Sequence, residues 1–155
     1  MKKIILLSIL TLFIIGCEKM EIEENYDTED YQIATFAGGC FWCTESDFEK
    51  QEGVLEVISG FSGGSEIDPS YKEVSSGITG HTEAVQVKFN PEIISYSDLL
   101  EVFWTHVDPT DTNGQFVDRG QQYRPAIFYH DEEQKKLAED SKIKLNESNI
   151  FNKPI

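Results

Sequence analysis

Between residues 33 and 146 the pattern of apolar side chains changes repeatedly from one typical of strands to one typical of helices. This order of elements constrains the fold more than any other feature of the sequence. Strands are expected at 33–37, 54–59, 82–89 and 126–129. Segment 54–59 is rich in β-branched residues, and 82–89 shows the alternation of apolar and polar side chains that is typical of a strand. A helical period covers 40–51, 99–104 and the charged segment from 132 to about 146. Segments 60–80 and 109–120 are rich in Gly, Ser and polar residues and are expected to be loops.

Capping signals mark the ends of these predicted helices. Gly53 follows the first helix, Ser95 and Asp98 form a capping box before the second, and Asp131 caps the third. The resulting order is strand, helix, strand, strand, helix, strand and a last helix. This order predicts an α+β fold of the ferredoxin-like split βαβ type, an antiparallel-rich mixed sheet with helices packed on one face.

The chain has 155 residues and a formal charge of −15, which fit one acidic domain. Such an excess of carboxylates argues against a nucleic-acid partner, because phosphate binding requires clustered Lys and Arg. A single domain working as a monomer is therefore expected.

The N-terminus has the pattern of an export signal. Lys2 and Lys3 precede an apolar run over 4–15 that is too short to span a bilayer, and Gly16 and Cys17 follow. Residues 14–17 resemble a bacterial lipobox, which implies cleavage after residue 16 and a lipid anchor on Cys17. An ordinary signal peptide or a short anchor is the alternative. Residues 17–31 are acidic and lack apolar periodicity, so we expect a flexible tether before a catalytic domain at 32–155.

Two cysteines begin the first predicted helix. Free N–H groups at a helix start favour an anion, so Cys40 is expected to have an enlarged thiolate fraction and to act as a nucleophile. Cys43 lies one turn away on the same face and is a candidate resolving thiol. The spacing also permits half a zinc site, thioredoxin-type exchange or two buried thiols. Too few further ligands are available for zinc, so no metal site is predicted.

Glu83 is a carboxylate on an apolar strand face. The two-residue period places it beside Val85, Val87 and Phe89. Burial there would favour the neutral acid, which could donate a proton. Alternatively, Glu83 reaches solvent at the end of the strand.

Several separated motifs resemble the A-type peptide-methionine sulfoxide reductases, which reduce the S epimer of methionine sulfoxide. They are Gly39-Cys40-Phe41-Trp42, Tyr71-Lys72-Glu73-Val74, Gly80-His81-Thr82-Glu83-Ala84-Val85 and Asp118-Arg119-Gly120-Gln121-Gln122-Tyr123-Arg124. The resemblance covers about 33–155, and the family's α+β fold agrees with the element order. Cys43 stands where many relatives have Gly.

The resemblance implies a role for each matching residue. Cys40 would attack the sulfoxide sulfur, and Phe41 and Trp42 would receive the methyl group. Glu83, with Tyr71 and Tyr123, would protonate the oxygen. In the same way, Asp118 would help to hold the substrate backbone.

The resemblance also implies a partner and a cycle. Cys40 would become a sulfenic acid and then a disulfide, which an external dithiol such as thioredoxin would reduce without a bound cofactor. Cys43 is the candidate partner in that disulfide, because it is the only other cysteine of the expected catalytic domain. The substrate would be free methionine sulfoxide or oxidised methionine in envelope proteins. The chain stops before a pocket-lining segment present in relatives, so a C-terminally truncated domain is expected. A general thiol-disulfide oxidoreductase and an inactive peptide-binding lipoprotein remain as alternatives.

Overall fold

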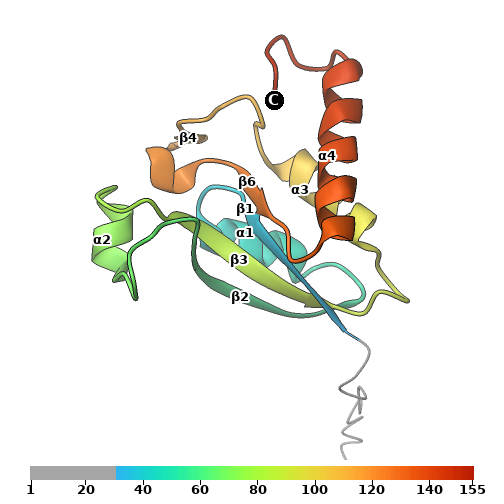
Figure 1. The fold of residues 1–155 in the computed structure, drawn as a ribbon, viewed down its shortest axis with the longest axis horizontal. Helices are drawn as coiled ribbons and strands as arrows, with labels where there is room; N and C mark the ends of the chain where they lie inside the picture. Colours follow the sequence, from blue (N-terminus) through green and yellow to red (C-terminus); the bar gives the residue numbers. More distant parts are fainter. Residues whose placement is uncertain (1–30) are drawn as a thin grey trace, which may run out of the picture.

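The computed structural model describes residues 31–155, so the predicted signal peptide, Cys17 and nearly all of the acidic tether lie outside the described residues. Figure 1 shows a sheet at the centre with helices around it. The elements are β1 (Gln32–Ala37), α1 (Phe41–Phe48), β2 (Val54–Ser62), α2 (Tyr71–Ser75), β3 (Thr82–Phe89), α3 (Tyr96–His106), β4 (Gly114–Gln115), β5 (Asp118–Arg119), the 3-10 helix η1 (Gln121–Tyr123), β6 (Ala126–Phe128) and α4 (Glu132–Glu147).

The main sheet has the strand order β2-β3-β1-β6. Every pairing in it is antiparallel, with Phe36 of β1 opposite Val85 of β3 and Phe61 of β2 opposite Glu83 of β3. The expectation of a mixed sheet was therefore wrong for the described strands. β1 and β2 both pair with β3, which lies between them. A second, two-stranded sheet joins β4 to β5.

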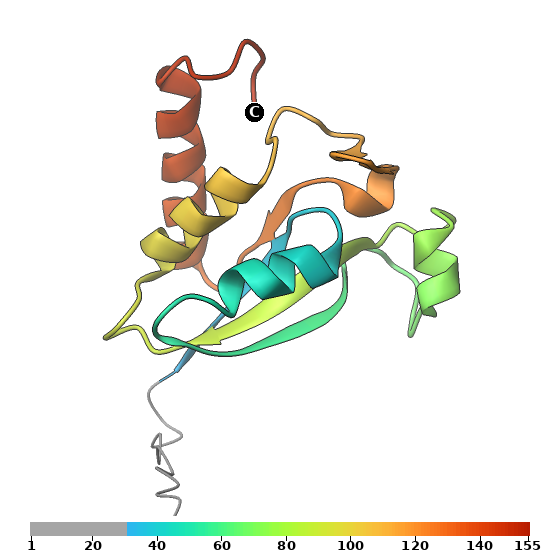
Figure 2. The same cartoon turned by 180° about the vertical axis from the view of Figure 1, so that it is seen from behind.

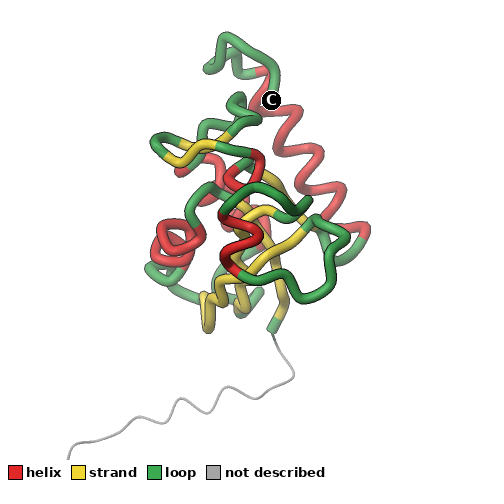
Figure 3. Tube along the Cα trace, turned by 90° about the vertical axis from the view of Figure 1, so that its left-hand side faces the viewer, coloured by secondary structure: helices red, strands yellow, loops and turns green. Residues whose placement is uncertain are grey.

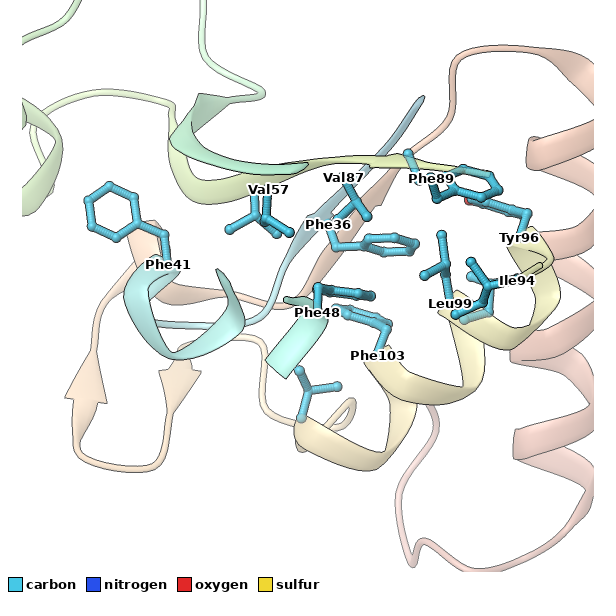
Figure 4. Packing of buried hydrophobic residues seen from close by; sticks show 14 residues of the cluster. Phe36, Phe41, Phe48, Val57, Val87, Phe89, Ile94, Tyr96, Leu99 and Phe103 are labelled. Atoms are coloured by element: carbon cyan, nitrogen blue, oxygen red, sulfur yellow. The ribbon is translucent and has the colours of Figure 1, made fainter. Parts of the chain in front are cut away.

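Helices α1 and α3 cover one face of the main sheet, as the sequence predicted, and α4 packs against α3 (Figure 2). The hydrophobic core lies between that face and the two helices (Figure 4). Its centre is a stack of aromatic rings in which Phe36 lies 4.9 Å from Phe48 and 5.4 Å from Phe103, measured between ring centroids. Trp104 packs at the edge of this core and donates a hydrogen bond to Ser141 of α4.

Two segments that were expected to be loops contain regular structure. Helix α2 lies within 60–80, where Ser70 and Glu73 form a capping box, a sequence signal that would have predicted it. Segment 109–120 contains the β4–β5 hairpin, whose strands of two residues are too short to show a period.

The predicted ends of the helices also need correction. α1 ends at Phe48 rather than at 51, because hydrogen bonds from Gln51 to Phe48 and from Val54 to Gln51 turn the chain into β2. α3 begins directly after Ser95, whose capping box with Asp98 is confirmed, and continues to His106, past the expected end.

α2 and the β4–β5 hairpin lie at the same end of the sheet (Figure 1), and Figure 3 views the molecule from that end. Among residues 31–155, no helix is both long enough and apolar enough to cross a bilayer.

Candidate active site

Cys40 lies in the tight connection between β1 and α1. It is the N-cap of α1, and its carbonyl oxygen accepts hydrogen bonds of 3.1 Å from the N–H groups of Cys43 and Thr44. Gly39 before it has φ +98°, and a Cβ there would lie 2.8 Å from Cβ of the buried Gln115. The turn therefore requires glycine and fixes where the Cys40 thiol leaves the backbone.

Glu83 is buried close to Cys40. Its side chain faces the helices with Val85 and Val87, and the residue is only 2% exposed, so the alternative that it reaches solvent is wrong. Glu83 Oε2 accepts a 3.0 Å hydrogen bond from the N–H of Phe41. Burial raises the pKa of Glu83, the Phe41 N–H opposes this shift, and the negative charge of Asp118 adds to it. The net effect favours a protonated carboxyl group.

Four aromatic rings gather beside this carboxyl group. Phe41, which lies at one end of the core in Figure 4, is 5.2 Å from Trp42, 5.9 Å from Phe61 and 6.2 Å from Tyr71. Trp42 is 63% exposed and lies 6.3 Å from Tyr71. We call Phe41, Trp42, Phe61 and Tyr71 the aromatic cluster. It forms an apolar wall open to solvent, suited to a small apolar group such as a methyl.

Tyr123 belongs to η1 and reaches the same region. Its pKa is raised by burial, and the charges of Glu83, Tyr71, Asp118 and Cys40 act in the same direction. A 2.8 Å hydrogen bond from Thr82 Oγ1 to the carbonyl oxygen of Gln122 ties η1 to β3 next to Glu83, although 40 residues separate Tyr123 from Glu83 in the sequence. A phenol that keeps its proton can donate a hydrogen bond to a bound oxygen.

A small cavity of about 150 Å³ opens on another side of Cys40. Cys43 and Asp118 line it, as do Asp47 and His106, which the sequence analysis did not select. Asp47 could have been found, because it lies one helical turn beyond Cys43 on the same face. His106 comes from α3, so no local pattern connects it to the cysteines.

Cys40 and Cys43 are both free thiols. Cys43 is exposed as a residue, yet partial burial of its thiol raises its pKa, and the adjacent Cys40, with which it shares a hydrogen bond, raises it further. Cys43 therefore retains its proton more firmly than an ordinary thiol. Cys40 and Cys43 line the same cavity, so the two thiols lie on one side of the start of α1.

All eight residues that were predicted for the site lie at this end of the sheet. Cys40, Cys43 and Asp118 line the cavity, while Phe41, Trp42 and Tyr71 belong to the aromatic cluster. Glu83 lies beside that cluster, bonded to the N–H of Phe41. No group of three or more His, Cys, Asp or Glu side chains suited to a metal ion occurs within residues 31–155.

A thiol, a buried carboxyl group and an aromatic wall in this arrangement invite comparison with known proteins. The family model described as peptide methionine sulfoxide reductase matches residues 32–155. The chain belongs to this family.

Individual relatives agree with this assignment. The chain is 58% identical over 127 residues to the peptide methionine sulfoxide reductase MsrA of Listeria monocytogenes serotype 4b, which covers 82% of this chain and 72% of the relative. Among solved structures, methionine sulfoxide reductase A of Corynebacterium diphtheriae has a TM-score of 0.70 at 28% identity, covering 82% of this chain and 63% of that one. Mxr1 from Saccharomyces cerevisiae in reduced form has a TM-score of 0.67 at 34% identity, with 77% and 72% covered. The described part of the chain is thus an MsrA-type α/β domain with an antiparallel sheet.

Proposed function

We propose that this chain reduces the S epimer of methionine sulfoxide, free or within proteins, to methionine. The observation that carries the proposal is the hydrogen bond between Glu83 and the N–H of Phe41, which holds a buried acid next to the nucleophile Cys40. Methionine sulfoxide is reversed by a separate enzyme for each epimer, and the A-type enzymes act on the S epimer.

The first step uses the acid side of the site. The S-methyl group rests against Phe41 and Trp42, while Glu83, Tyr71 and Tyr123 bind the sulfoxide oxygen. Glu83 gives its proton to that oxygen as the Cys40 thiolate attacks the sulfur, because the sulfur becomes electrophilic only as its oxygen is protonated. The attack forms a transient bond between the Cys40 sulfur and the substrate sulfur. The hydroxyl group then passes to the Cys40 sulfur as the substrate's sulfur–oxygen bond and this transient sulfur–sulfur bond break, which leaves Cys40 as a sulfenic acid and releases methionine. Asp118 helps to hold the substrate backbone.

The second step uses the cavity side. The Cys43 thiol attacks the Cys40 sulfenic acid, forming a disulfide and releasing water. An external dithiol of the thioredoxin type then reduces the disulfide and is itself oxidised, so no bound cofactor is required. The yeast relative Mxr1 has been solved in a complex with Trx2.

Three further features belong to this proposal. The sheet is of the ferredoxin-like split βαβ type, which the order β2-β3-β1-β6 supports. The enzyme acts as a monomer, a proposal that rests on the single-domain length of the chain. It is exported to the bacterial cell envelope and held there by lipid on Cys17, a proposal that rests on the sequence pattern of residues 2–17.

Two other functions account less well for the site. A general thiol-disulfide oxidoreductase would have no use for a buried Glu83, because thiol exchange transfers no oxygen. A peptide-binding lipoprotein would need the aromatic cluster but would have no use for the thiols of Cys40 and Cys43.

The test is dithiothreitol-driven reduction of the separated S and R epimers of an N-acylated methionine sulfoxide by the full chain, beside Cys40→Ser. We expect turnover of the S epimer only and none in the variant. Insulin reduction without sulfoxide turnover would establish the oxidoreductase. Binding of the S epimer that survives Cys40→Ser, with no turnover by the unmodified chain, would establish the binding protein.

A further inference from the structure

Gln122 is a buried polar residue that the proposed mechanism does not use. It lies in the middle of η1 and is 6% exposed. Its Nε2 donates a 3.0 Å hydrogen bond to the carbonyl oxygen of Ser75, the last residue of α2. This bond connects segments that are 47 residues apart in the sequence, which local folding does not require.

The backbone of Gln122 makes a second connection. Its carbonyl oxygen accepts a 2.8 Å hydrogen bond from Oγ1 of Thr82, which is fully buried at the start of β3. Thr82 immediately precedes Glu83, and Tyr123 immediately follows Gln122. Gln122 of η1 is therefore hydrogen-bonded to both α2 and β3.

Each of these three elements carries one proton-handling group of the proposed site. α2 begins at Tyr71, β3 contains Glu83, and η1 ends at Tyr123. α2 has only five residues, with Val74 as its one buried residue, so its own structure does little to fix Tyr71.

The surroundings of Gln122 leave its side-chain amide little room. A Cβ at Gly77 would lie 3.2 Å from Gln122 Oε1, and a Cβ at Gly120 would collide with the same atom. Gly77 follows α2 and Gly120 precedes η1, so both elements approach the amide through glycine. The backbone at Gly77 and the backbone at Gly120 thus both pack against the side-chain amide of Gln122.

We propose that Gln122 is a positioning residue of the reductase, holding Tyr71 and Tyr123 in register with Glu83. This inference rests on the proposed function and adds to it a residue that touches no reacting atom. The sulfoxide oxygen has to meet the carboxyl group and both phenols at once. A shift of about 1 Å in such a constellation can cost about 100-fold in rate.

The test replaces Gln122 by Met, which keeps the length of the side chain and removes the donor. Gln134→Met is the matched control, because Gln134 is also a buried glutamine, 4% exposed, and donates a 2.7 Å hydrogen bond to Ile33 at a distance from the site. We expect Gln122→Met to lower kcat/KM for the S epimer about 10- to 100-fold, mainly through kcat, while Gln134→Met stays close to the unmodified chain.

A double-mutant comparison separates positioning from a general structural role. If Gln122 acts through the tyrosines, Gln122→Met causes little further loss in a Tyr71→Phe/Tyr123→Phe background, because contributions that act as a unit are not additive. If Gln122→Met lowers kcat/KM by the same factor in the unmodified chain and in the double tyrosine variant, the inference is overturned. It is also overturned if Gln122→Met and Gln134→Met have the same kcat/KM.

Thr82→Val supplies a second variant in case Gln122→Met does not fold. It removes the hydroxyl that donates to the Gln122 carbonyl at 2.8 Å, together with the longer contacts of that hydroxyl to the carbonyl oxygens of Arg124 and Glu83. The branching of the side chain is kept, and we expect a smaller loss in the same direction. Full activity of a folded Thr82→Val would then count against the proposal. Absence of turnover in the unmodified chain would instead overturn the proposed function, and this inference with it.

Discussion

The N–H of Phe41 and the Oε2 of Glu83 are joined by a buried 3.0 Å hydrogen bond. Phe41 directly follows Cys40, the proposed nucleophile, so this bond fixes the position of the Glu83 carboxyl group relative to the Cys40 thiol as well as relative to the sheet. It also opposes the effect of burial on the pKa of Glu83. The acid thus remains anchored in either protonation state, because a carbonyl or a carboxylate oxygen can accept from this donor.

Replacing Glu83 by Gln should remove proton donation while keeping the acceptor for the Phe41 N–H. We expect the rate of methionine formation to fall by about 100- to 10,000-fold, the range typical of a lost general acid. Glu56→Gln, on an exposed position of β2, is the control and should leave the rate unchanged. A Glu83→Gln variant with full activity would remove Glu83 from the mechanism.

Glu83 should also make stability depend on pH. Its pKa in the folded chain lies above the ordinary 4.5, so the folded state binds this proton more tightly than the unfolded state does. The resulting stabilisation is complete below pH 4.5 and is lost as the pH rises through the raised pKa. Relative to the unmodified chain, Glu83→Gln should therefore gain stability with rising pH. Urea unfolding of both proteins from acid to neutral pH measures the difference, and a constant difference would contradict this.

Cys43→Ser should stop the cycle after one chemical step. Without reductant, both the variant and the unmodified chain should release about one equivalent of methionine from the S epimer, but only the variant should keep a sulfenic acid that dimedone captures. Disulfide formation in the unmodified chain should accelerate above neutral pH, because the raised pKa of Cys43 limits its thiolate. Equal dimedone capture by the two proteins would show that Cys43 does not resolve.

Gly39→Ala should destabilise the connection before Cys40. The new Cβ would impose strain at φ +98° and would lie 2.8 Å from Gln115 Cβ. We expect a loss of about 1–3 kcal/mol in the free energy of unfolding, measured by urea denaturation. Gly60→Ala is the control, because a Cβ there meets nothing within 4 Å, and it should change stability by less than about 0.5 kcal/mol. If both substitutions changed the free energy of unfolding by the same amount, the backbone at residue 39 would not be the source of the destabilisation.

Tyr96→Phe should leave stability unchanged or raise it by up to about 1 kcal/mol. Within residues 31–155 the buried Tyr96 hydroxyl has no hydrogen-bond partner, so its removal relieves an unmet polar group. Burial, with the charge of Asp131, raises the pKa of Tyr96 to about 12, so its phenol should ionise last in a spectroscopic titration. Tyr129→Phe, at an exposed ring, is the control, and a clear loss of stability in Tyr96→Phe alone would reveal a hidden partner.

Local sequence patterns were sufficient for much of the fold. The strand at 82–89 and the capping box of Ser95 with Asp98 were predicted where they occur, because period and capping depend on residues within one or two turns. The β4–β5 hairpin was missed for the same reason, since two-residue strands have no period. The pattern placed Glu83 on the strand face of Val85 and Val87 but left open whether its carboxyl group is buried or reaches solvent, and the structure shows that it is buried.

The amino-acid sequence was enough to predict the order of the elements and the apolar strand face on which Glu83 lies. The meeting of the Phe41 N–H with Glu83, the position of His106 at the cavity beside Cys43 and the bond that joins Gln122 of η1 to α2 were visible only in the folded chain. The physical reason is distance along the chain. Backbone period and capping act between neighbours, whereas these contacts join segments 40 or more residues apart and exist only once the sheet and its helices have packed.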